Sequence, residues 1–169
     1  MVCVAQLNKS LHQRMVKLKL QTYSLFIIIM QFVSDVHLEF LEQGELNLKN
    51  FVDPCADYLA ILGDLGYPHS ASFEQFLILA SELYKKVFYI AGNHEYYSFK
   101  NDTIPTMTDM DNKIESICAN IENVYYLNNK EHILEDNIVV LGTTLLSHIP
   151  ISKQNIIKNS INDYRYIYV

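Results

Sequence analysis

The chain has 169 residues, of which 50% are hydrophobic, and this composition argues against disorder and indicates one domain with a substantial core. Nineteen acidic and thirteen basic residues give a net charge of -6, so we expect no stable nucleic-acid complex held by surface charge. A phosphate substrate stays compatible with this charge, because a divalent cation can attract a phosphate locally.

The N-terminal third carries an apolar run at residues 23–33 that follows several basic residues. This run is too short to cross a bilayer as a helix, and no cleavage site for a signal peptide follows it. We therefore expect no membrane association and interpret the run as a buried strand. Because Met30 begins a segment typical of a domain start, we predict an N-terminal extension at residues 1–29 and a domain at residues 30–169.

Two further strands are predicted at residues 58–62 and 87–91, since continuous apolar runs are typical of strands covered on both faces. Residues 72–86 between them place apolar side chains at helical spacing, and Ser70 or Ser72 can cap this helix. A strand, a helix and a strand form a crossover unit, which predicts an α/β fold. The side chains expected on the buried face of the helix are Phe73, Phe76, Leu77, Ala80, Leu83 and Tyr84.

The second half of the chain predicts a helix from about residue 105 to residue 123, then short strands at residues 124–127, 132–134 and 138–141. Its three cysteines are widely separated and odd in number, so neither a disulfide framework nor a CxxC zinc motif is present. Reduced thiols favour a cytoplasmic protein. The cysteines are Cys3, Cys55 and Cys118.

Each predicted apolar strand ends in a polar cluster, and the carboxyl ends of strands are where α/β sheets bind ligands. Asp35 and His37 can share one cation, because alternate residues of an extended segment point the same way. A carboxylate with an imidazole suits Mn, Fe or Zn better than Mg or Ca. Asp64 follows the neighbouring strand and could bridge two ions, which would generate a hydroxide and clamp a phosphate. The clusters are Asp35-Val36-His37, Gly63-Asp64 and Gly92-Asn93-His94-Glu95.

These clusters resemble the signature of the calcineurin-like metallophosphoesterase family, which reads D-x-H, G-D-x-x-D, G-N-H-[DE], a histidine, and G-H-x-H. The first and third motifs are present, whereas the second is kept in part, with Tyr67 where many members have an acid. The stretches at residues 141–150 and 161–167 also resemble one bacterial-type branch of the family. The resemblance covers approximately residue 30 to the C-terminus.

The resemblance implies a four-layer α/β/β/α sandwich, of which this chain carries a part, and a metal-dependent phosphoesterase. Such an enzyme hydrolyses a phosphate ester through a metal-bound hydroxide at a dinuclear site. By position, Asp35 and His37 would hold the first metal, Asp64 would bridge, and Asn93 would bind the second metal. His94 would be the catalytic residue, which assists the leaving group or contacts the phosphate.

The later histidine motifs of the family have no counterpart, since His132 and His148 lie in neither a GH nor an HxH context. We therefore expect a C-terminally incomplete domain whose second metal site keeps only Asp64 and Asn93. The alternative function is a truncated or degenerate member that acts as a non-catalytic scaffold or remnant. His69, in the loop after Asp64, is expected to be structural or solvent-exposed.

Four residues near the predicted site stay open at this level. Glu95 could orient His94 or could be a solvated acid. Tyr96 and Tyr97 could border a substrate pocket, although aromatic side chains after a strand commonly just pack. Asp163 resembles a family position near the site, and the sequence assigns it no role.

Overall fold

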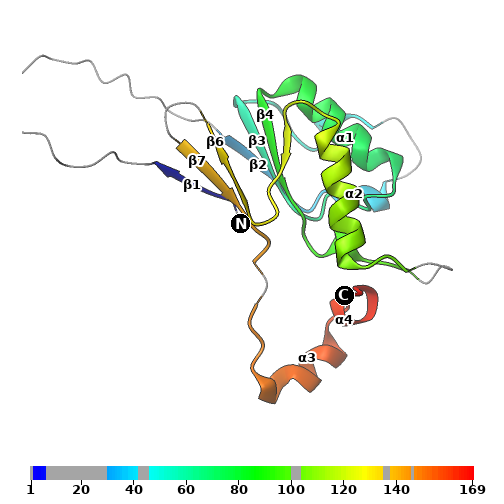
Figure 1. Cartoon of the computed structure of the whole chain (residues 1–169). Helices are drawn as coiled ribbons and strands as arrows, with labels where there is room; N and C mark the ends of the chain where they lie inside the picture. The colour runs from blue at the N-terminus through cyan, green and yellow to red at the C-terminus, as the bar shows by residue number, and fades with distance from the viewer. Residues whose placement is uncertain (1, 7–29, 42–45, 100–103, 135–137, 146) are drawn as a thin grey trace, which may run out of the picture.

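The computed structural model describes residues 2–6, 30–41, 46–99, 104–134, 138–145 and 147–169 (Figure 1). In chain order the strands and helices are β1 (Val2–Gln6), β2 (Met30–Val33), β3 (Tyr58–Leu62), α1 (Ala71–Leu83), β4 (Lys86–Ile90), α2 (Met107–Ala119), β5 (Val124–Tyr126), β6 (Lys130–Ile133), β7 (Ile138–Gly142), α3 (Gln154–Ser160) and α4 (Asp163–Tyr166). Strands and helices alternate from β3 to β5, as expected for an α/β fold.

A parallel four-stranded sheet with the order β2-β3-β4-β5 forms the centre of the fold. The central strands β3 and β4 are buried on both sides, which confirms the interpretation of these two apolar runs. The prediction that the first run forms a buried strand is wrong for β2, because this edge strand has no fully buried residue and Phe32 is 55% exposed.

On β3, Leu59 and Ile61 join the core under α1 and α2, whereas Ala60 joins a second core. On β4, Tyr89 belongs to the first core and Phe88 to the second. Helices α1 and α2 lie together on one side of this sheet (Figure 1).

An antiparallel sheet with the order β1-β7-β6 packs over the second core, on the side away from the two helices (Figure 1). The described residues thus form three layers, α/β/β, of the expected four-layer sandwich. Strand β1 comes from the segment that we predicted to be an extension, and it pairs with β7 from Val2↔Gly142 to Gln6↔Ile138. The domain boundary at residue 30 itself stays a prediction.

The ends of the helices follow their local capping chemistry. The Ser70 side chain accepts a hydrogen bond from the Phe73 N–H at 3.3 Å, which confirms the predicted cap of α1. Helix α1 ends at Leu83, earlier than predicted, where the Asn123 side chain donates to the Tyr84 carbonyl at 2.9 Å. The prediction that Leu83 is buried was wrong, because this side chain is 48% exposed. A capping box that Thr106 forms with Asp109 starts α2.

The C-terminal segment leaves β7, passes through α3 and α4, and returns to the start of α2 (Figure 1). The Ser98 N–H donates to the Tyr166 carbonyl at 2.8 Å, and the Met107 N–H donates to the Tyr168 carbonyl at 2.7 Å. These bonds place α4 beside the carboxyl ends of the parallel strands. Of the predicted strand at residues 23–33, only β2 lies within the described residues. Among the helices of the described ranges, none is long and apolar enough to cross a bilayer.

Candidate metal centre

The loops that follow β2 and β3 are joined by backbone hydrogen bonds at the carboxyl edge of the sheet. The Asp35 N–H donates to the Gly63 carbonyl at 3.2 Å, and the His37 N–H donates to the Asp64 carbonyl at 2.9 Å. Asp35, His37 and Asp64 have φ angles of 55°, 52° and 53°. Such angles are rare outside glycine, cost about 1–3 kcal/mol each, and cluster at functional sites. The backbone is therefore strained where the predicted metal ligands lie.

Two glycines bring the loops after β3 and β4 into direct contact. A Cβ atom on Gly63, whose φ is +87°, would lie 2.6 Å from the Gly92 nitrogen. A Cβ atom on Gly92 would overlap the Asp64 carboxylate. Any side chain at either position would thus push the two loops apart, and the close approach requires glycine.

The structure brings three of the predicted ligands together. One ligand atom from each of Asp35, His37 and Asp64 lies within 4.8 Å of the other two. Asp35 is exposed, whereas His37 and Asp64 are half-buried. Two carboxylates and an imidazole form a mixed oxygen and nitrogen donor set, which fits manganese, iron or zinc.

Asn93, the predicted ligand of a second metal, is oriented by the C-terminal segment. Its Nδ2 donates to the Tyr97 hydroxyl at 3.0 Å and to Asp163 Oδ1 at 2.9 Å. The Tyr97 hydroxyl donates to the same Asp163 oxygen at 2.7 Å, and burial together with this bond raises the pKa of Tyr97 to about 12. With both amide hydrogens engaged, the Asn93 amide oxygen is the atom left for a cation.

Glu39 is a site residue that the sequence reasoning missed. Its Oε1 lies 3.0 Å from His37 Nδ1 and 2.9 Å from His94 Nδ1, and its side chain is only 4% exposed. Burial alone would raise the pKa of Glu39, but the bonds from the two rings hold it below its ordinary value. Burial alone would lower the pKa of His37, but the carboxylate raises it. The spacing Asp35-x-His37-x-Glu39 was the available signal.

Glu95 joins the loops after β3 and β4. It is neither the residue that orients His94 nor a solvated acid, the two roles that the sequence left open. It is fully buried. Its Oε2 accepts hydrogen bonds from the Asp64 N–H at 3.1 Å and the Gly92 N–H at 2.8 Å. Its Oε1 accepts from the Leu65 N–H and the Tyr89 hydroxyl, both at 2.7 Å. Burial raises its pKa, whereas these donors favour the charged form. Glu95 thus ties together the loops after β3 and β4.

His94, the predicted catalytic residue, lies between Glu39 and Tyr97. Its ring stacks on Tyr97 with centroids 4.5 Å apart, and its backbone N–H donates to Asp64 Oδ1 at 2.9 Å. Tyr97 also lines a cavity of about 520 Å³ beside this site. Tyr96, by contrast, is buried and bonds to Asp111 at 2.7 Å. Of the two open tyrosines, Tyr97 borders a pocket and Tyr96 packs in the core.

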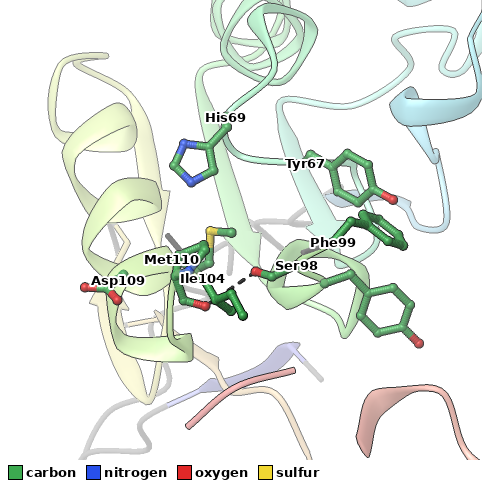
Figure 2. Close-up of a pocket in the computed structure, with 9 residues that line it drawn as sticks. Tyr67, His69, Ser98, Phe99, Ile104, Asp109 and Met110 are labelled. Carbon is green, nitrogen blue, oxygen red and sulfur yellow. Dashed lines mark hydrogen bonds between the residues drawn. The ribbon is translucent and has the colours of Figure 1, made fainter. Parts of the chain in front are cut away.

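The cavity is mainly aromatic and apolar, and it lies between the loop after β3 and the start of α2 (Figure 2). Tyr67 and Phe99 meet edge to face in its wall, with ring centroids 5.8 Å apart. Tyr67, where the family signature has an acid, is therefore part of this wall. The lining consists of Tyr67, His69, Tyr97, Ser98, Phe99, Ile104, Pro105, Asp109 and Met110.

Comparison with known proteins agrees with this geometry. Residues 32–167 match the calcineurin-like phosphoesterase family, so the match includes all the residues of the candidate site. The chain belongs to the calcineurin-like phosphoesterase family. The sequence resemblance on which we based the fold is thus confirmed.

Two relatives of this phosphoesterase-family chain are informative about its extent. An uncharacterized protein of Acanthamoeba polyphaga mimivirus is 38% identical over 146 residues, which cover 82% of this chain and 51% of that protein. The crystal structure of phosphopantetheinyl hydrolase from Mycobacterium tuberculosis is similar in fold, with a TM-score of 0.59 and 15% identity. That match covers 82% of this chain and 54% of the hydrolase. The chain therefore spans about half the length of each.

The other described histidines, His69, His132 and His148, do not belong to the cluster of Asp35, His37 and Asp64. His132 is in β6, where its ring packs 4.0 Å from the Tyr125 ring and 5.4 Å from the Phe88 ring, centroid to centroid. Burial lowers its pKa, as expected for a packed histidine. His148 is exposed after β7, and the exposed His69 lines the cavity. The exposure of His69 agrees with the prediction that it is structural or solvent-exposed.

Proposed function

We propose that the chain hydrolyses phosphate esters with two divalent metal ions, of manganese, iron or zinc. The observation that carries the proposal is the cluster of Asp35, His37 and Asp64, whose ligand atoms lie within 4.8 Å of one another. These residues would hold the first ion, and Asp64 together with Asn93 would hold the second. When bound, the ions supply a Lewis acid for the phosphate and lower the pKa of the attacking water.

His94 is the residue that we assign to the leaving group. Its Nδ1 is engaged by Glu39 at 2.9 Å, so its Nε2 is the ring atom available to the ester. A protonated Nε2 can hydrogen-bond to a phosphate oxygen or give its proton to the departing oxygen. The stack on Tyr97 restricts rotation of the ring, which keeps this atom in one direction.

The organic part of the ester would occupy the aromatic cavity. Tyr97 contacts His94 and also lines the cavity, so the cavity begins directly beside the proposed proton donor. Its lining of tyrosine, phenylalanine, isoleucine and methionine favours an aromatic group over a strongly charged one. The proposed substrate is therefore a phosphate ester of an aromatic alcohol.

Hydrolysis of an aryl phosphate in the presence of manganese tests this function. We expect turnover by the purified chain and its loss, by at least about a thousandfold, in Asp64→Asn, because the change removes a charged ligand shared by both ions. Asp57→Asn is the matched control, since Asp57 forms only a surface ion pair with Lys85 at 2.8 Å and its side chain is 58% exposed. It should keep full activity.

The alternative of a non-catalytic scaffold predicts a different result. A folded wild-type chain that binds manganese with no turnover of any aryl or alkyl phosphate would overturn the hydrolase proposal and favour the scaffold. Binding is measured by isothermal titration, and folding by circular dichroism. Equal activity of Asp64→Asn and Asp57→Asn would also contradict the proposed site.

A further inference from the structure

The proposed function uses the contact of Glu39 with His94, but it does not use the contact of the same carboxylate oxygen with His37. We propose that Glu39 is a positioning residue that holds both His37 and His94 with a hydrogen on Nδ1, so that both Nε2 atoms face the reaction site. One carboxylate would then orient a metal ligand and the proton donor together. The tautomer assignment stands on this chain's own geometry, and only its catalytic consequence rests on the proposed function.

The hydrogen-bond geometry carries the assignment. Glu39 Oε1 lies 3.0 Å from His37 Nδ1 and 2.9 Å from His94 Nδ1. An ionised carboxylate only accepts hydrogen bonds, so each ring must donate from Nδ1. A neutral imidazole has one N–H, and its Nε2 then carries a lone pair. The two rings meet edge to face with centroids 4.4 Å apart, as expected for rings that converge on one oxygen.

The environment of Glu39 is that of a functional carboxylate. Its side chain is 4% exposed, yet its second oxygen, Oε2, is buried with no hydrogen-bond partner. Leaving a polar atom buried without a partner costs about 1–3 kcal/mol, so a carboxylate selected only for stability would not sit there. The space exists because residue 66 is glycine: a Cβ atom on Gly66 would lie 3.2 Å from Oε2.

The positions of the two rings give the arrangement its consequence. His37 belongs to the cluster with Asp35 and Asp64, so a bare Nε2 is the atom that could bind a cation there. The His94 ring stacks on Tyr97, which lines the cavity, so the Nε2 of His94 is the atom that could contact the ester. Without Glu39, the His37 ring could take the other tautomer and present a hydrogen to the cation. The His94 ring can donate a proton from Nε2 while Nδ1 is protonated only as an imidazolium, and it would lose the carboxylate that stabilises this form.

Nitrogen-15 NMR of the histidine rings tests the assignment in the metal-free protein, without any measurement of activity. We expect the His37 and His94 rings to carry their hydrogen on Nδ1 in the wild type, with signals assigned by His37→Gln and His94→Gln. In Glu39→Ala both rings should lose this preference. His132 packs in the second core and serves as the internal reference, since its ring should not change.

The result that would overturn the proposal is equally clear. Wild-type rings with the hydrogen on Nε2, or Nδ1 signals that persist in Glu39→Ala, would contradict it. If circular dichroism shows Glu39→Ala to be unfolded, Glu39→Leu replaces it, because leucine fills more of the buried space and has no acceptor. Both rings should then lose their preference for Nδ1, and no change in either would reject the assignment.

Kinetics provide the second arm and separate this inference from the proposed function. We expect Glu39→Gln to lower kcat about 10-fold to 100-fold, a loss typical of residues that orient ligand histidines. KM should not change, because Glu39 does not line the cavity proposed for the substrate. In a His94→Ala background the same change should cost a smaller factor than in the wild type, because Glu39 then has only His37 left to position. Glu115→Gln, a change at a surface ion pair with Lys130, is the matched control.

The two arms fail in different ways. Full additivity of Glu39→Gln and His94→Ala would show that Glu39 does not act through His94. No turnover in the wild type, with the expected NMR result, would reject the hydrolase proposal and leave the tautomer assignment standing. Loss of one bound manganese per chain in Glu39→Gln, with no Nδ1–H signals in the wild type, would instead make Glu39 a ligand and overturn the assignment.

Discussion

The floor of the site and its C-terminal wall are built in opposite ways. The floor consists of Glu95 and the backbone N–H groups that donate hydrogen bonds to it, and the Glu95 side chain is fully buried. The wall consists of Asp163, Tyr97 and Phe99, which are half-buried or exposed. In the floor, one carboxylate accepts from three backbone donors of neighbouring loops and from the Tyr89 hydroxyl of β4. In the wall, Asp163 reaches Asn93 from 70 residues further along the chain.

This difference indicates that the floor and the wall have different roles. A buried carboxylate whose oxygens are all used has no capacity for a ligand, so the floor should determine stability. Half-exposed side chains leave their unused faces to solvent or substrate, so the wall should determine what binds. Variants of the two regions should therefore change different measurements.

The largest effect is expected in the floor. Glu95→Gln keeps the size of the side chain but turns an amide group toward donors that need an acceptor. Two hydrogen bonds are lost in a buried site, so we expect the free energy of unfolding to fall by about 3 kcal/mol. For a chain of this size that corresponds to a melting temperature lower by about 9 °C. Thermal and urea unfolding measure both quantities.

Glu115→Gln is the matched control for this change. Glu115 pairs with Lys130 at 2.6 Å, and both side chains are about half exposed. The same chemical substitution there should cost less than about 0.5 kcal/mol, since surface ion pairs contribute little. Equal losses in the two variants would break the comparison, because Glu95 would then behave as a surface group.

The parts of the fold that sequence predicts are those set by local pattern. The strands at β3 and β4 follow from continuous apolar runs, and the start of α1 follows from Ser70. The pairing of β1 with β7 joins residues 2–6 to residues 138–142, and no local pattern marks it. The end of α1 also depends on a distant side chain, Asn123.

The site divides in the same manner. Asp35, His37 and Asp64 could be placed together because each follows a strand of one parallel sheet. Asp163 was not assigned a role, because it acts through a hydrogen bond to Asn93, 70 positions away. Glu39 was missed although His37 lies two positions away, because its second partner, His94, is 55 positions away. Glu95 was misread since its partners are mostly backbone N–H groups, which a sequence does not display.

A smaller effect is expected for Asp163→Ala in the wall. The change frees the Asn93 amide, which loses one of the two acceptors that hold its oxygen in place. We expect manganese affinity to fall about tenfold, as for other residues that orient metal ligands, with a melting temperature near that of the wild type. Isothermal titration measures the affinity.

Asp57→Ala is the control, because its side chain is exposed and pairs only at the surface. A large drop in melting temperature without a change in manganese affinity would show that Asp163 determines stability, as Glu95 does. The proposed difference between floor and wall would then be wrong. Unchanged affinity with unchanged stability would show that Asn93 needs no support from α4.

The smallest effect is expected at Phe99, where the wall meets the cavity (Figure 2). Its ring is 53% exposed and contacts the rings of Tyr67 and Tyr166, with centroids 5.8 and 5.2 Å apart. An aromatic contact with substrate is worth about 1 kcal/mol, so Phe99→Ala should raise KM for aryl phosphates about fivefold and leave kcat unchanged. Steady-state kinetics with aryl and short alkyl phosphates measure the difference.

The alkyl esters test whether the effect is specific to aromatic substrates, because they offer no aromatic group to the ring of Phe99. Their KM should not change in Phe99→Ala, whereas a general loss of packing would raise KM for both kinds of ester. Phe32→Ala is the matched control, since Phe32 is 55% exposed on β2 and does not line the cavity. An equal rise in KM for aryl and alkyl esters would show that the wall supports the shape of the site without selecting its substrate.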